Sequence, residues 1–299
     1  MISKLSKLIF LVFILIGNRH CFSQNIPPLE PISKHYKTLA ELSAFPNTNR
    51  YDLDTIVFPW TEYSTSSLIS RARYMYLSSE DSARLPGLIR YPANSSDQTR
   101  AELDYLLQLQ DTRTKEQIER SQFIATIAPG QLLVNSHDSI FTTNTKDLFF
   151  IASSVGSWFT PKNFPATTKL MMKCIQDIKL TEFTLKRHFK RSRPYHLGLK
   201  LNPLTKVLTP AFPSGHTLWA FGEAFVLGEI VPEHRSEFIA AAEEVRWSRE
   251  IMGIHFPSDN EAARIIAWYL LKSWYHNPEF VRDMENAKKE WAMNKRMFK

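Results

Sequence analysis

Three short stretches of this 299-residue chain contain cationic, imidazole and carboxylate side chains in an order that suits chemistry on phosphate. A phosphate monoester carries a charge of about −2, which Lys and Arg side chains neutralise while they donate directed hydrogen bonds. One histidine can attack phosphorus while a second handles the proton of the leaving group. The pattern therefore predicts a metal-free site for phosphoryl transfer, built from Lys186, Arg193, His216, Arg249, His255 and Asp259.

The first stretch, KRHFKRSRP, supplies two of the cations. Lys186 and Arg193 are seven residues apart, which is nearly two helical turns, so on one helix both would project from the same face. Pro194 disfavours helical geometry at Arg193, so we expect the helix to end there with the guanidinium at the mouth of a pocket. Taken alone, five cations in eight residues also fit a solvated basic face or a nucleic-acid patch.

The second stretch is PSGH, which opens an apolar run. Ser214 is a candidate N-cap residue, and Gly215 permits close approach of the backbone to a ligand. Backbone N–H groups at such a helix start can bind an oxyanion together with the Ser214 hydroxyl. His216 would then stand beside the anion and protonate a departing alkoxide. Taken alone, these four residues favour an ordinary cap with a surface histidine.

The third stretch, SREIMGIHFPSD, repeats this arrangement. Pro257 suits the first position of a helix, so His255 should lie just before that helix and Asp259 in its first turn. A carboxylate there can accept a hydrogen bond from one imidazole nitrogen and leave the other unprotonated. Arg249, near the end of the preceding helix, can reach the same pocket. The alternative role for Asp259 is that of an acid that complements the helix dipole.

The elements that must position these residues are helices. Strand signals are nearly absent, so we predict an all-α fold, a single helical-bundle domain preceded by an irregular N-terminal arm. The run after PSGH is apolar almost all round, which predicts a buried central helix. Thr114 and Gln117 can form a capping box at the start of a helix. The predicted helices begin after Arg100 and span about 114–127, 146–158, 167–191, 215–230, 235–252, 258–275 and 279–295.

The first 23 residues read as a secretory signal peptide. Lys4 and Lys7 precede nine apolar residues, Leu8 to Ile16, which is far short of the ~20 that span a bilayer. Cleavage after Ser23 would remove three of the 37 basic residues and none of the 30 acidic ones, leaving a net charge of +4. This charge suits anionic substrates but is too weak to indicate nucleic acid. We expect a periplasmic or secreted protein without a membrane anchor after cleavage.

After cleavage Cys174 is the remaining cysteine, so no internal disulfide is expected. Its neighbours are apolar, which favours a buried, inert thiol over a nucleophile.

Together, the three stretches resemble the signature of the type 2 phosphatidic acid phosphatase superfamily. This signature reads Lys, six residues, Arg-Pro; then Pro-Ser-Gly-His; then Ser-Arg, five residues, His, three residues, Asp. Eighteen residues separate the first two pieces and 31 the last two, which fits the soluble branch. Within the superfamily, the chain is most similar to the class A bacterial non-specific acid phosphatases, from about Arg100 to Trp291. The resemblance implies an acid phosphatase domain over residues 99–299. Residues 24–98, rich in Pro, Ser, Asn and Tyr and poor in apolar clusters, indicate an N-terminal arm packed on it.

The resemblance also implies roles for the site residues. His255 would be the nucleophile and form a phosphohistidine, Asp259 would orient it, and His216 would protonate the leaving alcohol. The phosphoryl oxygens would be bound by Lys186, Arg193, Ser214, Gly215 and Arg249. No metal or other cofactor is expected, and the substrates would be small-molecule phosphomonoesters hydrolysed at acidic pH. We expect the pocket walls to come from helices between Leu103 and Ala128 and from loops near Trp158 to Pro165.

Two other functions stay open. Vanadium-dependent haloperoxidases share the fold and the anion-binding residues, and vanadate could occupy the phosphate site. A non-catalytic anion-binding or nucleic-acid-binding module would explain the basic stretch near Lys186. A lipid phosphatase is disfavoured because membrane helices are not predicted. The sequence leaves the oligomeric state open, although members of the family often self-associate into homo-oligomers.

Overall fold

The computed structural model describes residues 29, 33–59, 73–129 and 136–296, so the expected signal segment 1–23 lies outside the described residues. The described residues form helices and turns, and their pairing of extended backbone is limited to an isolated antiparallel bridge between Val57 and Arg191. The all-α class predicted from the sequence is confirmed. None of the described helices combines the length and the apolar character that crossing a bilayer requires.

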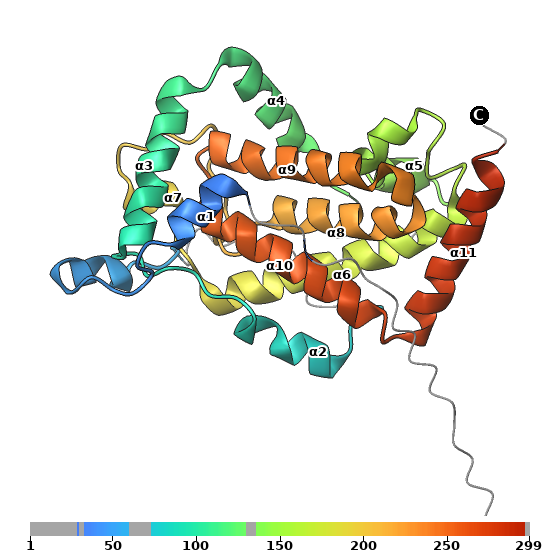
Figure 1. Ribbon diagram of the computed structural model, residues 1–299, viewed down its shortest axis with the longest axis horizontal. Coiled ribbons are helices and arrows are strands. Elements are labelled where there is room, and N and C mark those ends of the chain that lie inside the picture. The colour runs from blue at the N-terminus through green and yellow to red at the C-terminus, as the bar shows by residue number, and fades with distance from the viewer. Residues whose placement is uncertain (1–28, 30–32, 60–72, 130–135, 297–299) are drawn as a thin grey trace, which may run out of the picture.

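The helices surround one central member, α8 (Figure 1). Helix α8 packs against α6, α9, α10 and α11, and α4 packs against α9. The α-helices are α1 (Lys34–Ala40), α2 (Ser79–Arg84), α3 (Asp97–Thr112), α4 (Lys115–Thr126), α5 (Phe141–Thr145), α6 (Pro165–Phe189), α7 (Pro194–Leu197), α8 (Gly215–Ile230), α9 (Arg235–Ile251), α10 (Pro257–Trp274) and α11 (Pro278–Asn294).

Helix α8 is central because it has no polar face to present to water. Trp219 and Phe225 are each 1% exposed, and Phe221 is fully buried. Burial of one such side chain contributes about 1.5–3 kcal/mol. The buried central helix predicted from the apolar run is therefore confirmed.

Local signals fixed several helix starts as expected. At the start of α4, the Thr114 hydroxyl accepts from the Gln117 N–H at 3.3 Å, and the Gln117 side chain accepts from the Thr114 N–H at 2.9 Å. Pro257 is the first residue of α10. These devices satisfy backbone donors that would otherwise lack partners.

The prediction of a helix over residues 146–158 is wrong. Helix α5 ends at Thr145, and a 3₁₀ segment follows over Phe150–Val155. Ala152 has non-helical dihedral angles inside that segment, and Gly156 ends it with φ +130°, which helices do not use. The apolar spacing that suggested a helix instead serves aromatic packing, in which Phe149 and Phe159 stack with ring centroids 4.8 Å apart.

The region before α3 is tied to the bundle by backbone hydrogen bonds. The Asp177 carboxylate on α6 accepts from the N–H groups of three successive residues, Met75, Tyr76 and Leu77. The Phe58 N–H donates to the carbonyl of Lys190 just after α6. Residues of this region therefore lie along both the middle and the end of α6.

Candidate functional site

The first motif spans the end of α6 rather than continuing it. Helix α6 ends at Phe189 because Lys190 adopts a left-handed conformation with φ 53°. Arg193 therefore lies outside the helix, at the N-cap position of the short α7, and the expectation that it shares a helical face with Lys186 is wrong. The solvated basic face is also excluded at these two positions, because Lys186 and Arg193 are each 1% exposed.

Both cations are anchored to the loop that leads into the second motif. Lys186 Nζ donates to the Pro210 carbonyl at 2.6 Å, and Arg193 Nε donates to the Thr209 carbonyl at 2.8 Å. Burial, followed by the charge of Arg193, lowers the pKa of Lys186 to about 7. Burial lowers the pKa of Arg193 to about 10. Two desolvated cations without an ion-pair partner in the described residues create a site that favours an anion.

The second motif brings the start of α8 against the start of α10. The Ser214 N–H donates to the Asp259 carbonyl at 3.1 Å, and the Thr217 hydroxyl donates to Asn260 Oδ1 at 2.8 Å. Ser214 occupies the N-cap position, but its hydroxyl pairs with the Thr217 hydroxyl at 3.0 Å instead of capping a backbone N–H. Two helix N-termini with positive dipole ends thus lie side by side.

The third motif fixes the protonation of His255. Its Nδ1 lies 3.2 Å from Asp259 Oδ2, and its Nε2 lies 2.8 Å from Arg193 Nη1. A guanidinium only donates, so Nε2 must be the unprotonated nitrogen and Nδ1 must carry the proton. Burial and the Arg193 charge hold the pKa of His255 well below its usual value. The Nε2 lone pair of the imidazole therefore accepts a hydrogen bond from Arg193 in the empty site.

Asp259 remains ionised although it is fully buried. Burial alone would raise its pKa, but the Arg191 guanidinium, followed by His255, lowers it to about 2. Arg191 Nη1 donates to Asp259 Oδ1 at 2.6 Å, and the Phe256 N–H donates to Oδ2 at 2.9 Å. The carboxylate is held in one orientation by partners on both oxygens.

Arg249 and His216 share the electrostatic environment of this cluster but direct their hydrogen bonds elsewhere. Arg249, near the end of α9 and 1% exposed, donates to the Ser121 carbonyl of α4 at 3.2 Å. Burial, followed by the charge of Arg193, lowers the pKa of Arg249 to about 10. His216, at the start of α8, is partly buried, and burial followed by the Arg249 charge holds its pKa well below the usual value. The Nε2 atom of His216 has no hydrogen-bond partner among the described residues.

Hydrogen bonds join Arg193 to His255 and His255 to Asp259, and the Ser214 N–H donates to the Asp259 carbonyl. Lys186 and Arg193 donate to the neighbouring carbonyls of Pro210 and Thr209. Besides burial, the charge of Arg193 lowers the pKa of Arg249, and the charges of Arg249 and His255 lower the pKa of His216. Gly215, the first residue of α8, lies against the Glu182 carboxylate of α6. Within the described residues, no group of three His, Cys, Asp or Glu side chains lies close enough together to hold a metal ion. Cys174 is buried as expected, and burial raises its pKa well above the usual value.

Sequence reasoning missed a buried network behind Asp259. Arg191 contacts Asp259 Oδ1 and donates to the Ser258 hydroxyl at 2.8 Å, and its Nη2 lies 3.6 Å from Glu102 Oε2. Glu102 in α3 also accepts from the Ser258 N–H and hydroxyl, at 3.0 and 2.8 Å. Arg191 and Arg193 lie on either side of Ser192 in non-helical backbone. In extended backbone, residues two positions apart point to the same side. This spacing is the signal that could have predicted a buried position for Arg191 beside Arg193.

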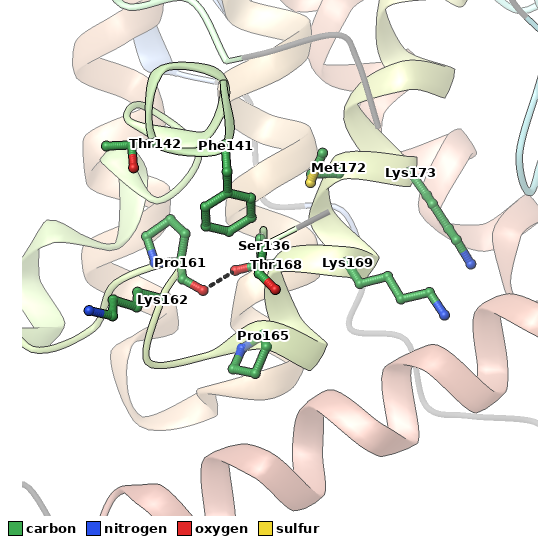
Figure 2. A pocket seen from close by; sticks show the side chains of 10 residues that line it. All are labelled: Ser136, Phe141, Thr142, Pro161, Lys162, Pro165, Thr168, Lys169, Met172 and Lys173. Carbon is green, nitrogen blue, oxygen red and sulfur yellow. Dashed lines mark hydrogen bonds between the residues drawn. The ribbon is translucent and has the colours of Figure 1, made fainter. Parts of the chain in front are cut away.

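A cavity of about 750 Å³ lies away from these residues, beside the first half of α6. Figure 2 shows Phe141, Pro161 and Met172 around it, with the Thr168 hydroxyl donating to the Pro161 carbonyl. None of the predicted site residues lines this cavity. Pro161, Lys162 and Pro165, in the loop that was expected to form a wall of the phosphate pocket, line this cavity.

Comparisons with known proteins bear on the same part of the chain. Residues 170–282, which contain all three motifs, match the family model described as PAP2 superfamily. Over 151 residues, the chain is 32% identical to a non-specific acid phosphatase from Providencia stuartii. This match covers 48% of this chain and 61% of that protein. Over 80 residues, it is 34% identical to an acid phosphatase from Zymomonas mobilis subsp. mobilis, covering 27% of this chain and 30% of that protein. The chain therefore spans less than two thirds of either relative.

A solved structure, that of a transmembrane PAP2 type phosphatidylglycerolphosphate phosphatase from Bacillus subtilis, matches with a TM-score of 0.43 and 20% identity. That match covers 68% of this chain and 96% of the solved chain. The resemblance predicted from the three motifs is confirmed by the family match and by the acid phosphatase relatives.

Proposed function

We propose that this chain, whose residues 170–282 match the PAP2 superfamily model, is an acid phosphatase that hydrolyses small phosphate monoesters with broad leaving-group tolerance. The observation that carries the proposal is the geometry at His255. Its Nε2 lone pair faces Arg193 at 2.8 Å while Asp259 holds the opposite nitrogen. A nucleophile directed at a cluster of desolvated cations suits attack on a phosphoryl group. The names of the relatives support the same reaction.

The reaction would proceed in two displacements. In the first, His255 Nε2 forms a bond to phosphorus, the bond from phosphorus to the ester oxygen breaks, and His216 gives its proton to the leaving alcohol. In the second, water attacks the phosphohistidine and gives a proton to His216, and the nitrogen–phosphorus bond breaks to release orthophosphate. Both histidines return to their starting states, so the cycle balances.

The low pKa of His216 in the empty site fits this sequence. Burial, followed by the charges of Arg249 and Lys179, disfavours its protonated form, whereas a bound phosphoryl group would bring a charge of the opposite sign. Substrate binding therefore favours the protonated imidazole that must serve as the acid. His216 would take this proton from solvent or from the substrate's monoanion as the substrate binds, and it would regain it from water in the second displacement.

The phosphoryl oxygens would be bound by Lys186, Arg193, Arg249, the Ser214 hydroxyl and the backbone at Gly215. Their positive charges would neutralise the in-line transition state, which is the role that a metal pair plays in other phosphatases. We therefore propose a metal-independent enzyme. Export through the segment 1–23 would place it in the periplasm or outside the cell.

The test is a pH-resolved assay of the purified full-length protein against a panel of phosphate monoesters, with and without a metal chelator. We expect hydrolysis of several monoesters, best below neutral pH, with rates unchanged by the chelator. Loss of activity in chelator would overturn metal independence. The absence of hydrolysis, together with halide oxidation by peroxide after vanadate loading, would instead identify a haloperoxidase. Salt-sensitive DNA binding without hydrolysis would support a non-catalytic module.

A further inference from the structure

One carboxylate of the site has no place in the mechanism above. Glu182 lies on α6, one turn before Lys186 and one turn after Lys179, so the three side chains follow the same face of the helix. Glu182 is 7% exposed, and the Lys179 side chain is 17% exposed. The pair is therefore withdrawn from bulk water, unlike an ordinary surface pair.

The Glu182 carboxylate lies directly against the start of α8. A Cβ atom added to Gly215 would lie 1.9 Å from Glu182 Oε1 and 2.7 Å from Oε2. The carboxylate therefore occupies the space that a side chain at position 215 would fill, beside the proposed phosphate-binding backbone. Lys179 Nζ lies 3.4 Å from Oε2 and restrains the carboxylate from the outer side.

The charges of this pair act on the groups that the reaction uses. Glu182 favours the protonated forms of Lys186 and Arg193. Lys179 disfavours the protonated forms of Lys186 and His216. The charged and titratable groups around Glu182 are therefore Lys179 and Lys186 on α6, Arg193 beyond its end, and His216 on α8. The contact with Gly215 at the start of α8 places Glu182 beside the proposed anion site.

We propose that Glu182 is a resident counter-ion of the phosphate pocket and sets its affinity for orthophosphate. Its carboxylate balances part of the positive charge of the empty site and repels the incoming anion. The pocket would then release orthophosphate readily instead of retaining it as a tight inhibitor. Lys179 limits the effect by neutralising part of the carboxylate charge. The consequence for turnover rests on the proposed function, whereas the effect on anion binding does not.

The experiment is a calorimetric titration of the full-length protein with orthophosphate, which detects binding without catalysis. Glu182→Gln keeps the shape of the side chain and removes its charge, so we expect binding about tenfold tighter than in the wild type. Lys179→Gln removes the partner that neutralises Glu182, so binding should weaken severalfold. Glu279→Gln is the matched control, because Glu279 pairs with Lys173 of α6 at 2.6 Å, away from the site.

The outcomes separate this inference from the proposed function. Unchanged or weaker binding in Glu182→Gln, with a wild-type melting temperature and with hydrolysis intact in the wild type, would overturn the inference and leave the phosphatase standing. Tighter binding in Glu182→Gln without any hydrolysis by the wild type would support the inference and reject the phosphatase. Absence of orthophosphate binding in both the wild type and Glu182→Gln would overturn the inference, and hydrolysis by the wild type would decide the proposed function separately. In the hydrolysis assay, inhibition of Glu182→Gln by added orthophosphate should strengthen by a similar factor.

Discussion

At the scale of single residues, the cations of the site differ in how firmly they hold their charge. The arginines Arg193 and Arg249 keep a pKa of about 10 despite burial, so both stay charged through neutral pH. Lys186 has a pKa of about 7 and loses its proton within the working range. Asp259, with a pKa of about 2, keeps orienting His255 in acid. The acid preference of the free enzyme is therefore expected to depend on Lys186.

This gives a prediction about the alkaline limb of the pH profile. As pH rises through about 7, Lys186 becomes neutral, one cation is lost from the site, and kcat/KM for a phosphate monoester should fall. In Lys186→Arg, the guanidinium stays charged, so the limb should move up by more than about one pH unit even if the maximum rate drops. The measurement is kcat/KM from pH 4 to 9. Lys200→Arg, at an exposed position, is the control, and an identical limb in both variants would exclude Lys186 as its cause.

At the scale of elements, helix α8 carries the PSGH turn at one end and an unusual carboxyl in its middle. Glu223 is fully buried, and neither of its oxygens meets hydrogen-bond geometry with a partner in the described residues. Burial raises its pKa well above the usual value, although the nearby Trp219 indole lowers it somewhat. The folded helix therefore favours the protonated, neutral form.

This state makes stability depend on pH in a defined direction. Because the folded pKa of Glu223 lies above the unfolded value, its neutral form is fully compatible with folding at low pH, and stability is lost as pH rises toward the folded pKa. Glu223→Gln cannot ionise, so its stability relative to the wild type should increase from pH 4 to pH 8. The gain should be about 1.4 kcal/mol for each unit by which the pKa is raised. Urea unfolding at both pH values measures it.

Glu229→Gln is the matched control for that experiment. It removes a carboxylate from the outer end of the same helix, where Glu229 pairs with Arg235 at 3.2 Å. We expect no comparable gain with pH. If Glu223→Gln tracked the wild type at both pH values, the carboxyl would have to be ionised and paired in the folded protein.

The elements also show how far sequence reasoning reaches. Helices α8 and α10 could be predicted because an apolar run and Pro257 act locally. The end of α6 could not, because Lys190 adopts its left-handed conformation where the chain turns to meet Phe58 of a distant segment. The site cations followed from the motifs, but Arg191 and Glu102 did not. Their role depends on contacts between positions 89 residues apart in the chain.

At the scale of the whole molecule, Arg191 joins parts of the chain that are remote in sequence. It bridges Val57 through its backbone, lies 5.0 Å from the Tyr91 ring centroid, and contacts Asp259 and Glu102 through its guanidinium. Burial raises the pKa of Glu102 to about 7, so the Arg191 guanidinium balances the charge of this second carboxylate only in part. Stability and the orientation of the Asp259 carboxylate are therefore expected to depend on the same side chain.

Arg191→Met tests this dependence. The substitution fills a similar volume but leaves Asp259 buried without its cation, which should destabilise the fold by about 3–5 kcal/mol. Denaturant unfolding gives the difference directly. Arg187→Met, four residues earlier and exposed, should leave stability unchanged. Equal stability of the two variants would mean that the buried network does not hold the fold together.

The most direct test of the account is to trap the phosphoryl group on the protein. The full-length enzyme is mixed briefly with labelled phosphate monoester and quenched in alkali, because phosphohistidine is labile in acid, and the labelled residue is identified by mass spectrometry. The account predicts label on His255, loss of both label and turnover in His255→Ala, and retention of both in the exposed His188→Ala. Normal turnover in His255→Ala, or label on any other residue, would contradict it.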